Sequence, residues 1–477
     1  MRARTHSLAV LAVTLVLVGA AGAWAQPGEP SEPALPAGLA PPPQPAPQTN
    51  APDEPALPAG LGPAVPASAP EETGPRLPFD LTGFWEGRAG LRLLSDPFER
   101  AASLGESRLQ LDLEDAIKGL TLHLTSDFIV DGLAPETPVR LETGDGFVDL
   151  RTASVAFSPT SFADLKVGRQ ILTWGTGDLL FINDLFPKDW NAFFIGRDEE
   201  YLKAPSDAAK LSLFSRFANL DVIYTPRFDA DRFIDGRRLS FFDAARGRRV
   251  GRDAVVRAAR PGGWFKGDEW ALRLYRNFGA YEAAVYGYVG FWKSPAGLDP
   301  ATGQATFPAL AVVGASLRGP VGPGIANVEV GLYRSSDDRR GDNPLIRNGE
   351  VRLLAGYERE IAKNLTLGLQ YYIERMTDFA RFRVALPFGA PAQRRSHQLI
   401  TQRLTWLTLN QNLTWSLFVF FSPTDTDAYL RPRISYKLSD HFTVETGGNL
   451  LFGKTAHTFF GQLQDNTNIY ASLRYGF

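Results

Sequence analysis

Apolar and polar residues alternate along most of the chain after Leu81. In RLQLDLED, one face of the segment carries Leu109, Leu111 and Leu113, and the opposite face is polar or charged. The same period of two recurs in LTLHLTSDF, VRLLAGYERE and LTLGLQYYIE. Because successive side chains of a strand point to opposite faces, this period predicts strands that separate two different media.

The pattern predicts about 18 strands. The gaps between them alternate between short and long. Short gaps such as DAIKG, SPTS and RFAN alternate with long ones at 129–146, 172–207, 226–268, 293–306, 335–349 and 376–397. The gap SPTDTD, which begins at Ser422, is short where a long loop is due. Outer-membrane barrels have short periplasmic turns at one rim and long extracellular loops at the other, whereas a β-sandwich has no reason to sort its loops.

We therefore predict an all-β fold, a closed transmembrane antiparallel β-barrel of about 18 strands over residues 79–477. In a membrane every backbone amide must be paired, so the last strand has to meet the first. The final strand, NIYASLRYGF, fits this requirement because Ile469 and Leu473 alternate with Ser472 and Arg474. A barrel of this strand number is wide enough to leave an aqueous lumen unless something fills it.

The chain ends on alternating aromatic residues, Tyr475 and Phe477. This ending resembles the C-terminal signature of bacterial outer-membrane proteins, which the barrel-assembly machinery reads. The resemblance implies that both residues belong to an assembly signal and that this machinery is a partner.

The N-terminal region has a different composition. Residues 1–25 combine Arg2 and Arg4, an apolar run and the small-residue motif AWA, which predicts a cleaved signal peptide. Residues 26–78 are rich in Pro and Ala and repeat the phrase EPALPAGL, which favours a disordered leader in the periplasm. A spacer is the favoured interpretation of this leader, and a periplasmic docking arm is the alternative.

The polar faces of the predicted strands carry charges of both signs. The candidate lumen cations are Arg88, Arg92, Lys166, Arg273, Arg352, Arg431, Arg433, Lys437 and Arg474. The candidate lumen anions are Glu86, Asp112, Glu114, Asp127, Glu282, Glu329, Glu358, Glu374 and Glu445. Mixed charges predict weak ion selectivity or recognition of a polar solute. Within this set, Arg431, Arg433 and Lys437 form a basic track on one strand; the alternative is that these charges are merely solvated or paired.

The predicted loop 172–207 is unusually aromatic for a segment in water. We expect it to fold into the barrel as a constriction or partial plug; packing against lipopolysaccharide or another subunit is the alternative. The candidate constriction residues are Arg169, Trp174, Asp178, Asp189 and Trp190. Strict alternation places Arg169 on the lipid-facing side of the strand, with Val167, unless Gly168 permits a bulge that redirects it.

This region also carries a resemblance to known proteins. The segments VGRQILTWG, NDLFPKDW and EEYLKAP are similar to a stretch of proteobacterial outer-membrane barrels distantly akin to the alginate-export porins. The matching positions are Gly168, Arg169, Gln170, Trp174, Gly175, Asn183, Pro187, Asp189, Glu200, Leu202 and Lys203. The Asn-Pro step of those barrels is split here as NDLFP. The resemblance covers about 60 residues and implies a passive channel of unspecified solute.

The second long loop, 226–268, is rich in arginine. Six arginines lie within 15 residues of one another: Arg246, Arg248, Arg249, Arg252, Arg257 and Arg260. On the cell exterior they are suited to lipopolysaccharide phosphates or to an anionic solute at the pore mouth. The alternative is a solvated loop whose arginines are balanced by Asp229, Asp231, Asp235 and Asp243.

Composition narrows the remaining functions. The chain has no cysteine and a net charge of −2, so disulfides, thiolate metal sites and a nucleic-acid-binding field are not expected. We expect no cofactor, no metal and no nucleic acid. The sequence predicts a porin-like channel for a hydrophilic or amphiphilic solute, and not an enzyme. A plugged scaffold that houses a partner protein, such as an electron-conduit cytochrome, is the alternative, and a hydrolase at the rim is a weaker one.

Overall fold

A computed structural model of the protein describes residues 80–134, 137–387 and 393–477. The signal peptide predicted at 1–25 and the leader predicted at 26–78 lie outside the described residues. The fold below is that of the described part of the chain.

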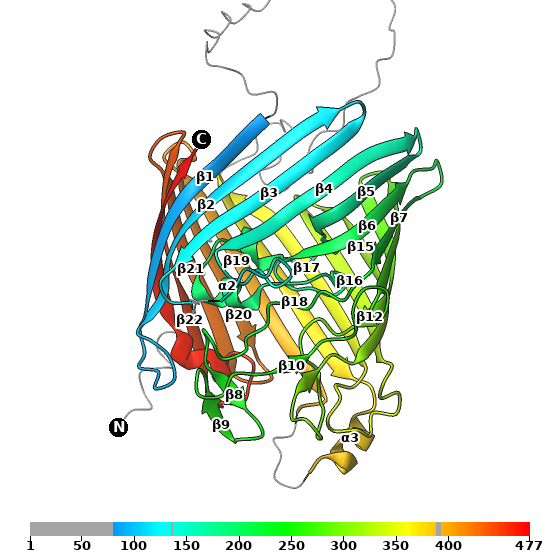
Figure 1. The fold of residues 1–477 in the computed structure, drawn as a ribbon, viewed down its shortest axis with the longest axis vertical. Coiled ribbons are helices and arrows are strands. Elements are labelled where there is room, and N and C mark those ends of the chain that lie inside the picture. Colours follow the sequence, from blue (N-terminus) through cyan, green and yellow to red (C-terminus); the bar gives the residue numbers. More distant parts are fainter. Residues whose placement is uncertain (1–79, 135–136, 388–392) are drawn as a thin grey trace, which may run out of the picture. The chain divides into compact units, whose positions relative to one another are not determined.

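Eighteen antiparallel strands form one closed sheet (Figure 1). The strands, in the order in which they pair around the barrel, are β1 (Asp80–Arg92), β2 (Ala102–Ile117), β3 (Leu120–Asp131), β4 (Val148–Thr160), β5 (Ala163–Ile171), β6 (Pro205–Leu213), β7 (Asn219–Thr225), β11 (Glu269–Phe278), β12 (Tyr281–Phe291), β15 (Ala309–Val321), β16 (Gly324–Ser335), β17 (Glu350–Ala362), β18 (Leu365–Met376), β19 (Ser396–Thr408), β20 (Leu413–Ser422), β21 (Asp427–Lys437), β22 (Phe442–Gly453) and β23 (Asn468–Gly476). The predicted fold class and strand number are confirmed.

Short elements lie in the connections. The small strands are β8 (Phe241–Asp243), β9 (Arg248–Val250), β10 (Ala258–Ala259), β13 (Gly297–Leu298) and β14 (Ala305–Thr306). The helices are α2 (Trp190–Ile195), α3 (Phe379–Ala385), and the 3-10 turns η1 (Glu199–Leu202) and η2 (Gly461–Asn466). Within the described ranges, no helix has the length and apolar character needed to cross a membrane.

The first and last strands close the barrel. Trp85 of β1 pairs with Tyr475 of β23, and the backbones of Gly83 and Phe477 exchange two hydrogen bonds of 3.0 Å each. The side chains of Tyr475 and Phe477 are exposed on the outer face, while Arg474 points inward and donates to Glu86 at 3.0 Å. The alternation at the C-terminus therefore separates an apolar outside from a charged inside.

The connections sort by length into two rims. The short-turn rim carries the connections 118–119, 161–162, 214–218, 279–280, 322–323, 363–364, 409–412 and 438–441. The long-loop rim carries 93–101, 132–147, 172–204, 226–268, 292–308, 336–349, 377–395, 423–426 and 454–467. In Figure 1 the short-turn rim is at the top, and α3 and β8–β9 lie at the bottom. The connection 423–426 is the short exception that the sequence indicates.

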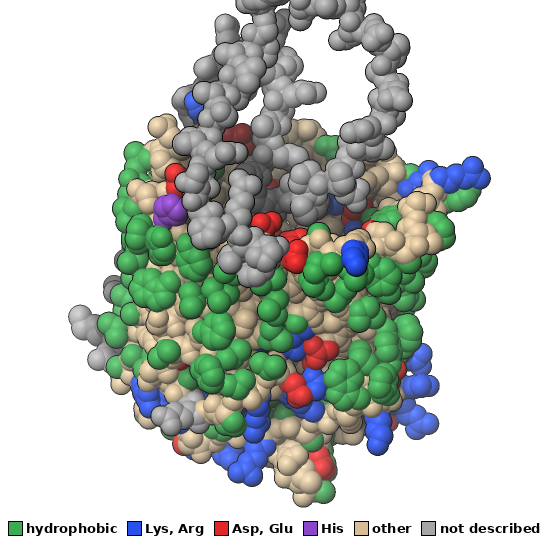
Figure 2. All heavy atoms as spheres, turned by 45° about the horizontal axis from the view of Figure 1, so that its top comes forward, with side chains coloured by type: hydrophobic (Ala, Val, Ile, Leu, Met, Phe, Trp, Pro, Cys, Tyr) green, Lys and Arg blue, Asp and Glu red, His purple; other side chains and the backbone are tan. Residues whose placement is uncertain are grey.

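The two faces of the wall differ in chemistry. Large apolar side chains such as Val289, Val313 and Leu332 are more than half exposed on the outside, because none of the described residues covers them. Figure 2 shows a broad apolar belt on one face of the wall, with Lys and Arg gathered along its lower edge. Inward positions instead bury charges, as at Arg108 and Asp127, which form an ion pair. Such a wall suits hydrocarbon outside and polar contacts inside.

Candidate functional site

The loop 172–204 between β5 and β6 packs inside the ring of strands (Figure 1). Its short helix α2 begins at Asp189, whose carboxylate accepts a hydrogen bond from the amide of Ala192 at 2.8 Å. The helix ends at Gly196, with a φ of 94°. A Cβ at Gly196 would lie 2.3 Å from a ring carbon of Tyr470 on β23, so the close approach to the wall requires glycine.

One side of the loop, here the aromatic face, consists of Trp174, Phe186, Phe193 and Phe194. Phe193 and Phe194 lie 5.7 and 5.2 Å from the ring of Tyr429 on β21, between ring centroids. Phe193 and Phe194 are almost fully buried. Since aromatic side chains carry large apolar areas, these contacts anchor the loop to the wall about 230 residues away in sequence.

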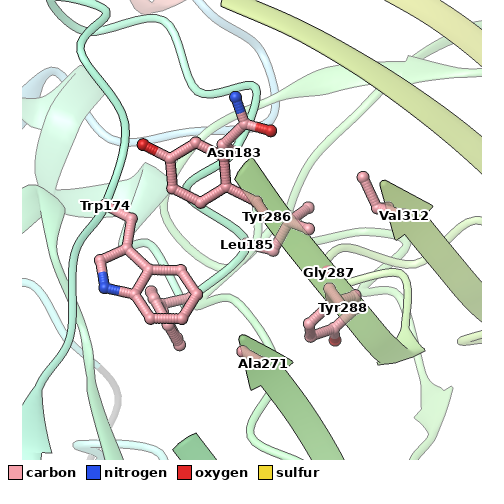
Figure 3. A pocket seen from close by; sticks show the side chains of 9 residues that line it. Trp174, Asn183, Leu185, Ala271, Tyr286, Gly287, Tyr288 and Val312 are labelled. Atoms are coloured by element: carbon pink, nitrogen blue, oxygen red, sulfur yellow. The ribbon is translucent and has the colours of Figure 1, made fainter. Parts of the chain in front are cut away.

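The start of the loop packs on the opposite part of the wall. Trp174 lies 5.1 Å from Phe186 and 6.0 Å from Tyr286 of β12, between ring centroids. Figure 3 shows Trp174 and Tyr286 on either side of a small cavity that Asn183 also lines. The cavity offers about 10 Å³, which is the lower limit for one water molecule. It is too small to be a solute site.

Glu329 of β16 holds the loop through its backbone. Its carboxylate accepts hydrogen bonds from the amide of Gly177 at 2.8 Å, from the amide of Thr176, and from the side chain of Asn183 at 3.1 Å. Glu329 is almost fully buried. The sequence pattern places Glu329 in the lumen but gives no sign that it binds the loop, because its partners are amides.

The other side of the loop, here the acidic face, consists of Asp178, Asp198, Glu199 and Glu200. It meets arginines on the inward side of β19, β21 and β23. Asp178 receives two hydrogen bonds from Arg403 at 2.6 and 2.9 Å. Glu199 pairs with Arg403 and with Arg431, each at 3.2 Å, and Glu200 pairs with Arg474 at 3.2 Å.

The acidic face is partly open to solvent, unlike the aromatic face. The side chains of Asp178, Glu199 and Glu200 are 39%, 30% and 44% exposed. Partial burial raises the pKa of Asp178 above its usual value, although Arg403 opposes the shift. Burial acts on Glu199 in the same direction, but there Arg403 and Arg431 outweigh it and lower the pKa. The acids therefore titrate at different pH although they line one surface.

The three residues of the basic track have different surroundings in the structure. Arg431 contacts Glu199 and lies over the ring of Phe193, 4.3 Å from its centroid. Arg433 pairs with Glu445 at 3.2 Å. Lys437 lies at the end of β21 and makes no ion pair within the described residues. Arg403, which binds the loop most closely, follows the same alternation but was not singled out by the sequence.

A second loop supports α2. Trp190 donates its indole N–H to Asp231 at 3.0 Å, and Asp189 lies 3.4 Å from a guanidinium nitrogen of Arg232. Arg232 also donates two hydrogen bonds of 2.7 Å to Asp149 of β4, and so it joins the helix to the wall. The loop 226–268 therefore reaches the lumen through these residues.

Arg169 lies apart from the other predicted constriction residues. The pairing of β5 with β4 and β6 continues without a shift through Gly168, although Gly168 has a φ of 121°. By this register Arg169 has the parity of the exposed Val167, as strict alternation predicts. Its guanidinium is nevertheless buried, because it donates to the carbonyls of residues 141 and 150 and to Asp207 at 3.1 Å.

The arginines of the loop 226–268 are largely paired within the chain. Arg246 pairs with Asp243, Arg248 with Asp253 at 2.7 Å, Arg249 with Asp465 at 2.6 Å and Arg252 with Glu99 at 3.2 Å. Of the four acids named beside this loop in the sequence, only Asp243 pairs with one of these arginines. Closure of the barrel brings in Glu99 and Asp465 from other connections.

Histidine at the long-loop rim has acidic and hydroxyl neighbours. In His397, Nε2 lies 3.1 Å from Asp425 and 3.4 Å from the hydroxyl of Ser422. A Ser-His-Asp relay requires the serine and a hydrogen-bonded carboxylate on different ring nitrogens. The other nitrogen of His397, Nδ1, lies 4.0 Å from Glu374, which is beyond hydrogen-bond distance, so this arrangement does not form a relay. In the described part of the chain, no group of His, Asp and Glu side chains is arranged to hold a metal.

Comparison with known proteins shows that solved structures of outer-membrane proteins have a similar fold. No protein-family model matches the chain, and no curated protein sequence does. The solved structure of OccAB4 of Acinetobacter baumannii is similar, with 9% identity over 83% of this chain and 97% of that chain and a TM-score of 0.50. OccK11 (OpdR) of Pseudomonas aeruginosa is 11% identical over 83% of this chain and 94% of that chain, with a TM-score of 0.47. At such identities only the barrel fold is shared. The resemblance to alginate-export porins stays a prediction.

Proposed function

We propose that the protein is an outer-membrane channel of a Gram-negative bacterium, for passive or facilitated passage of a hydrophilic or amphiphilic solute. The observation that carries this proposal is a closed barrel whose wall buries charged side chains on its inner face while its exterior is an apolar belt. The long-loop rim faces the cell exterior in this proposal, and the short-turn rim faces the periplasm, as is general for such barrels. In this orientation β1 begins on the periplasmic side, where the leader is expected.

In this proposal the loop 172–204 sets the width and the charge of the passage. The aromatic face fixes the loop to β21, and the acidic face lies opposite Arg403, Arg431 and Arg474. These acids and arginines are in contact, so they present both signs of charge side by side, and we expect their local field to orient a dipolar solute in the passage. A zwitterionic or amphiphilic solute with separate charges suits such a field better than a simple ion does.

The scaffold alternative has less support. A partner protein inside the barrel needs the central lumen, and that position holds α2 and its buried contacts with Phe420 and Tyr429. A partner would therefore have to displace the aromatic face of the loop. Asp178 and Glu199 already have arginine partners, so they do not call for a second chain.

The test is the conductance of the full chain in a planar bilayer, compared with a variant that lacks residues 176–203. Removal of the loop is expected to enlarge the conductance steps, or to produce steps where the full chain is closed. Deletion of the exposed turn 299–304 at the long-loop rim is the matched control and is expected to leave the steps unchanged. Equal steps from the full chain and the loop deletion would overturn the assigned role of the loop, and silence in both would overturn the channel.

A further inference from the structure

Two outward-facing arginines interrupt the apolar pattern of the wall at the long-loop rim. On β16 the outward residues Val328, Val330 and Leu332 are followed by Arg334. On β18 the outward residues Tyr371 and Ile373 are followed by Arg375 in the same way. Both arginines are exposed, and the strand register places them on the outer surface.

The strand between the two arginines has no bulky or charged side chain on its outer surface at this height. β17 separates β16 from β18, and Arg334 lies two residues beyond the row that Arg375 shares with Val351. The backbone positions of the two arginines are therefore about 12 Å apart. Val351, the outward partner of Arg375 on β17, is apolar, and Gly349, next to Arg334, has no side chain. The amide of Thr377 donates to the carbonyl of Gly349 at 3.0 Å, which extends the sheet to this height.

Nearby acids are engaged elsewhere. Asp337 accepts a hydrogen bond from the amide of Ala309 at 2.8 Å, and Asp378 accepts one from the hydroxyl of Thr377 at 3.1 Å. Among the described residues, neither Arg334 nor Arg375 has a carboxylate within 4.0 Å. The loops above them add four exposed arginines, which are Arg339, Arg340, Arg381 and Arg383.

The height of the pair matches a membrane interface. A strand tilted by about 40° gains roughly 2.5 Å of height per residue, so the eight steps from Ala326 to Arg334 span about 20 Å. The apolar belt of such barrels is about 25 Å tall. The two guanidinium groups therefore lie where lipid chains give way to headgroups, and an arginine there is favourable because its stem stays apolar and its charge reaches phosphate.

We propose that Arg334 and Arg375 form a binding site for the phosphate groups of a membrane lipid on the outer wall of the barrel. Guanidinium groups bind phosphate with two parallel hydrogen bonds, and two arginines about 12 Å apart suit a headgroup with two phosphates. Lipid A of lipopolysaccharide has such a headgroup, whereas phosphatidylglycerol has one phosphate. The orientation rests on the proposed function, in which the long-loop rim meets the outer leaflet.

The test is native mass spectrometry of the purified full chain in detergent with added bisphosphorylated lipid A. The R334Q/R375Q variant is expected to bind lipid A roughly tenfold more weakly than the unaltered chain, since two charge-assisted contacts are lost. The R359Q variant is the matched control, because Arg359 is an outward, exposed arginine at the short-turn end of β17. It is expected to bind as the unaltered chain does.

Three results would overturn the site or its assigned lipid. If R334Q/R375Q binds lipid A as tightly as the unaltered chain does, the proposed site is contradicted. If R359Q loses as much lipid A binding as R334Q/R375Q does, the loss is a general effect of positive charge and not of this site. Phosphatidylglycerol that displaces lipid A at equal concentration would reassign the lipid to a monophosphate. Bilayer conductance of R334Q/R375Q is expected to be unchanged, so a failure of the channel proposal shows in conductance, and a failure of this site shows in lipid binding.

Discussion

The two faces of the loop 172–204 hold it to the barrel in different ways. The aromatic face buries Phe193 and Phe194 against Tyr429, in contacts that exclude water. The acidic face leaves Asp178 and Glu200 partly exposed and relies on arginines of the wall. Apolar burial is insensitive to salt and pH, whereas partly exposed ion pairs are screened. We therefore expect the aromatic face to supply stability, and in the proposed channel we expect the acidic face to control passage.

The largest effect is expected on the aromatic face. Phe193→Ala removes a buried ring that touches Phe420 and Tyr429, and we expect it to lower the free energy of unfolding by about 3–5 kcal/mol. Denaturant unfolding of the folded protein measures this change. The control is Phe217→Ala in the short turn 214–218, where the ring is 63% exposed and the change is expected to stay within about 0.5 kcal/mol. Similar losses from both variants would remove the distinction between the faces.

A smaller loss of stability is expected where a single carboxylate holds the loop backbone. Glu329→Gln keeps the size of the side chain but removes the negative charge of the group that accepts hydrogen bonds from the amides of Thr176 and Gly177. We expect a loss of about 1–3 kcal/mol, because buried donors lose a charged acceptor. Proteolysis of the folded barrel provides the second readout, since the loop should be cut more readily. Unchanged stability together with unchanged cleavage would contradict the role of Glu329 as the anchor of the loop.

The acidic face is expected to affect selectivity more than stability. The variant D178N/E199Q removes two negative charges from the passage. One charge at about 4 Å in water is worth about 1 kcal/mol, so the local cation concentration should fall by up to about fivefold for each charge. The reversal potential in a salt gradient should therefore shift toward anion preference. The control is Glu142→Gln, an exposed acid in the loop 132–147, and a shift of the same size in this control would contradict the assignment.

The smallest effect is expected from pH. The pKa of Asp178 is raised by partial burial, so on acidification it is neutralised before Glu199, whose pKa the arginines lower. The destabilisation due to the Asp178 charge disappears as pH falls through its folded pKa. The stabilisation due to Glu199 is present above its unfolded pKa and is lost as pH falls through its folded pKa. Selectivity measured during acidification should thus change in two steps, and D178N should remove the first.

The sequence predicts the wall well because the wall depends on local pattern. The alternation of Leu109 and Leu111 with Gln110 is visible in the local sequence and does not depend on distant residues. The order of short and long gaps can also be read without knowing which residues are in contact. The inward packing of the loop 172–204 was expected from its aromatic residues alone, since such residues avoid water. Its effect on passage stays a prediction.

The partners of the loop could not be predicted, because they depend on how the barrel closes. Asp178 and Arg403 are 225 residues apart and meet only once strand order and register are set. Arg169 shows the limit of motif reading, since it stands beside Gly168 and Gln170 in a recognisable segment and yet has the parity of an outward residue in the register of β5. The role of Glu329 as an anchor was also hidden, because two of its partners are the backbone amides of Thr176 and Gly177, which no residue type reveals.

The central claim is that the acidic face of the loop lines the passage. The chain has no cysteine, so E199C places one reactive thiol on this face. A bulky, positively charged methanethiosulfonate reagent is then applied during recording in a planar bilayer. We predict that conductance falls after the reagent reacts with E199C and stays constant for V384C, at an exposed position of α3. Full labelling of E199C with unchanged conductance would contradict the claim.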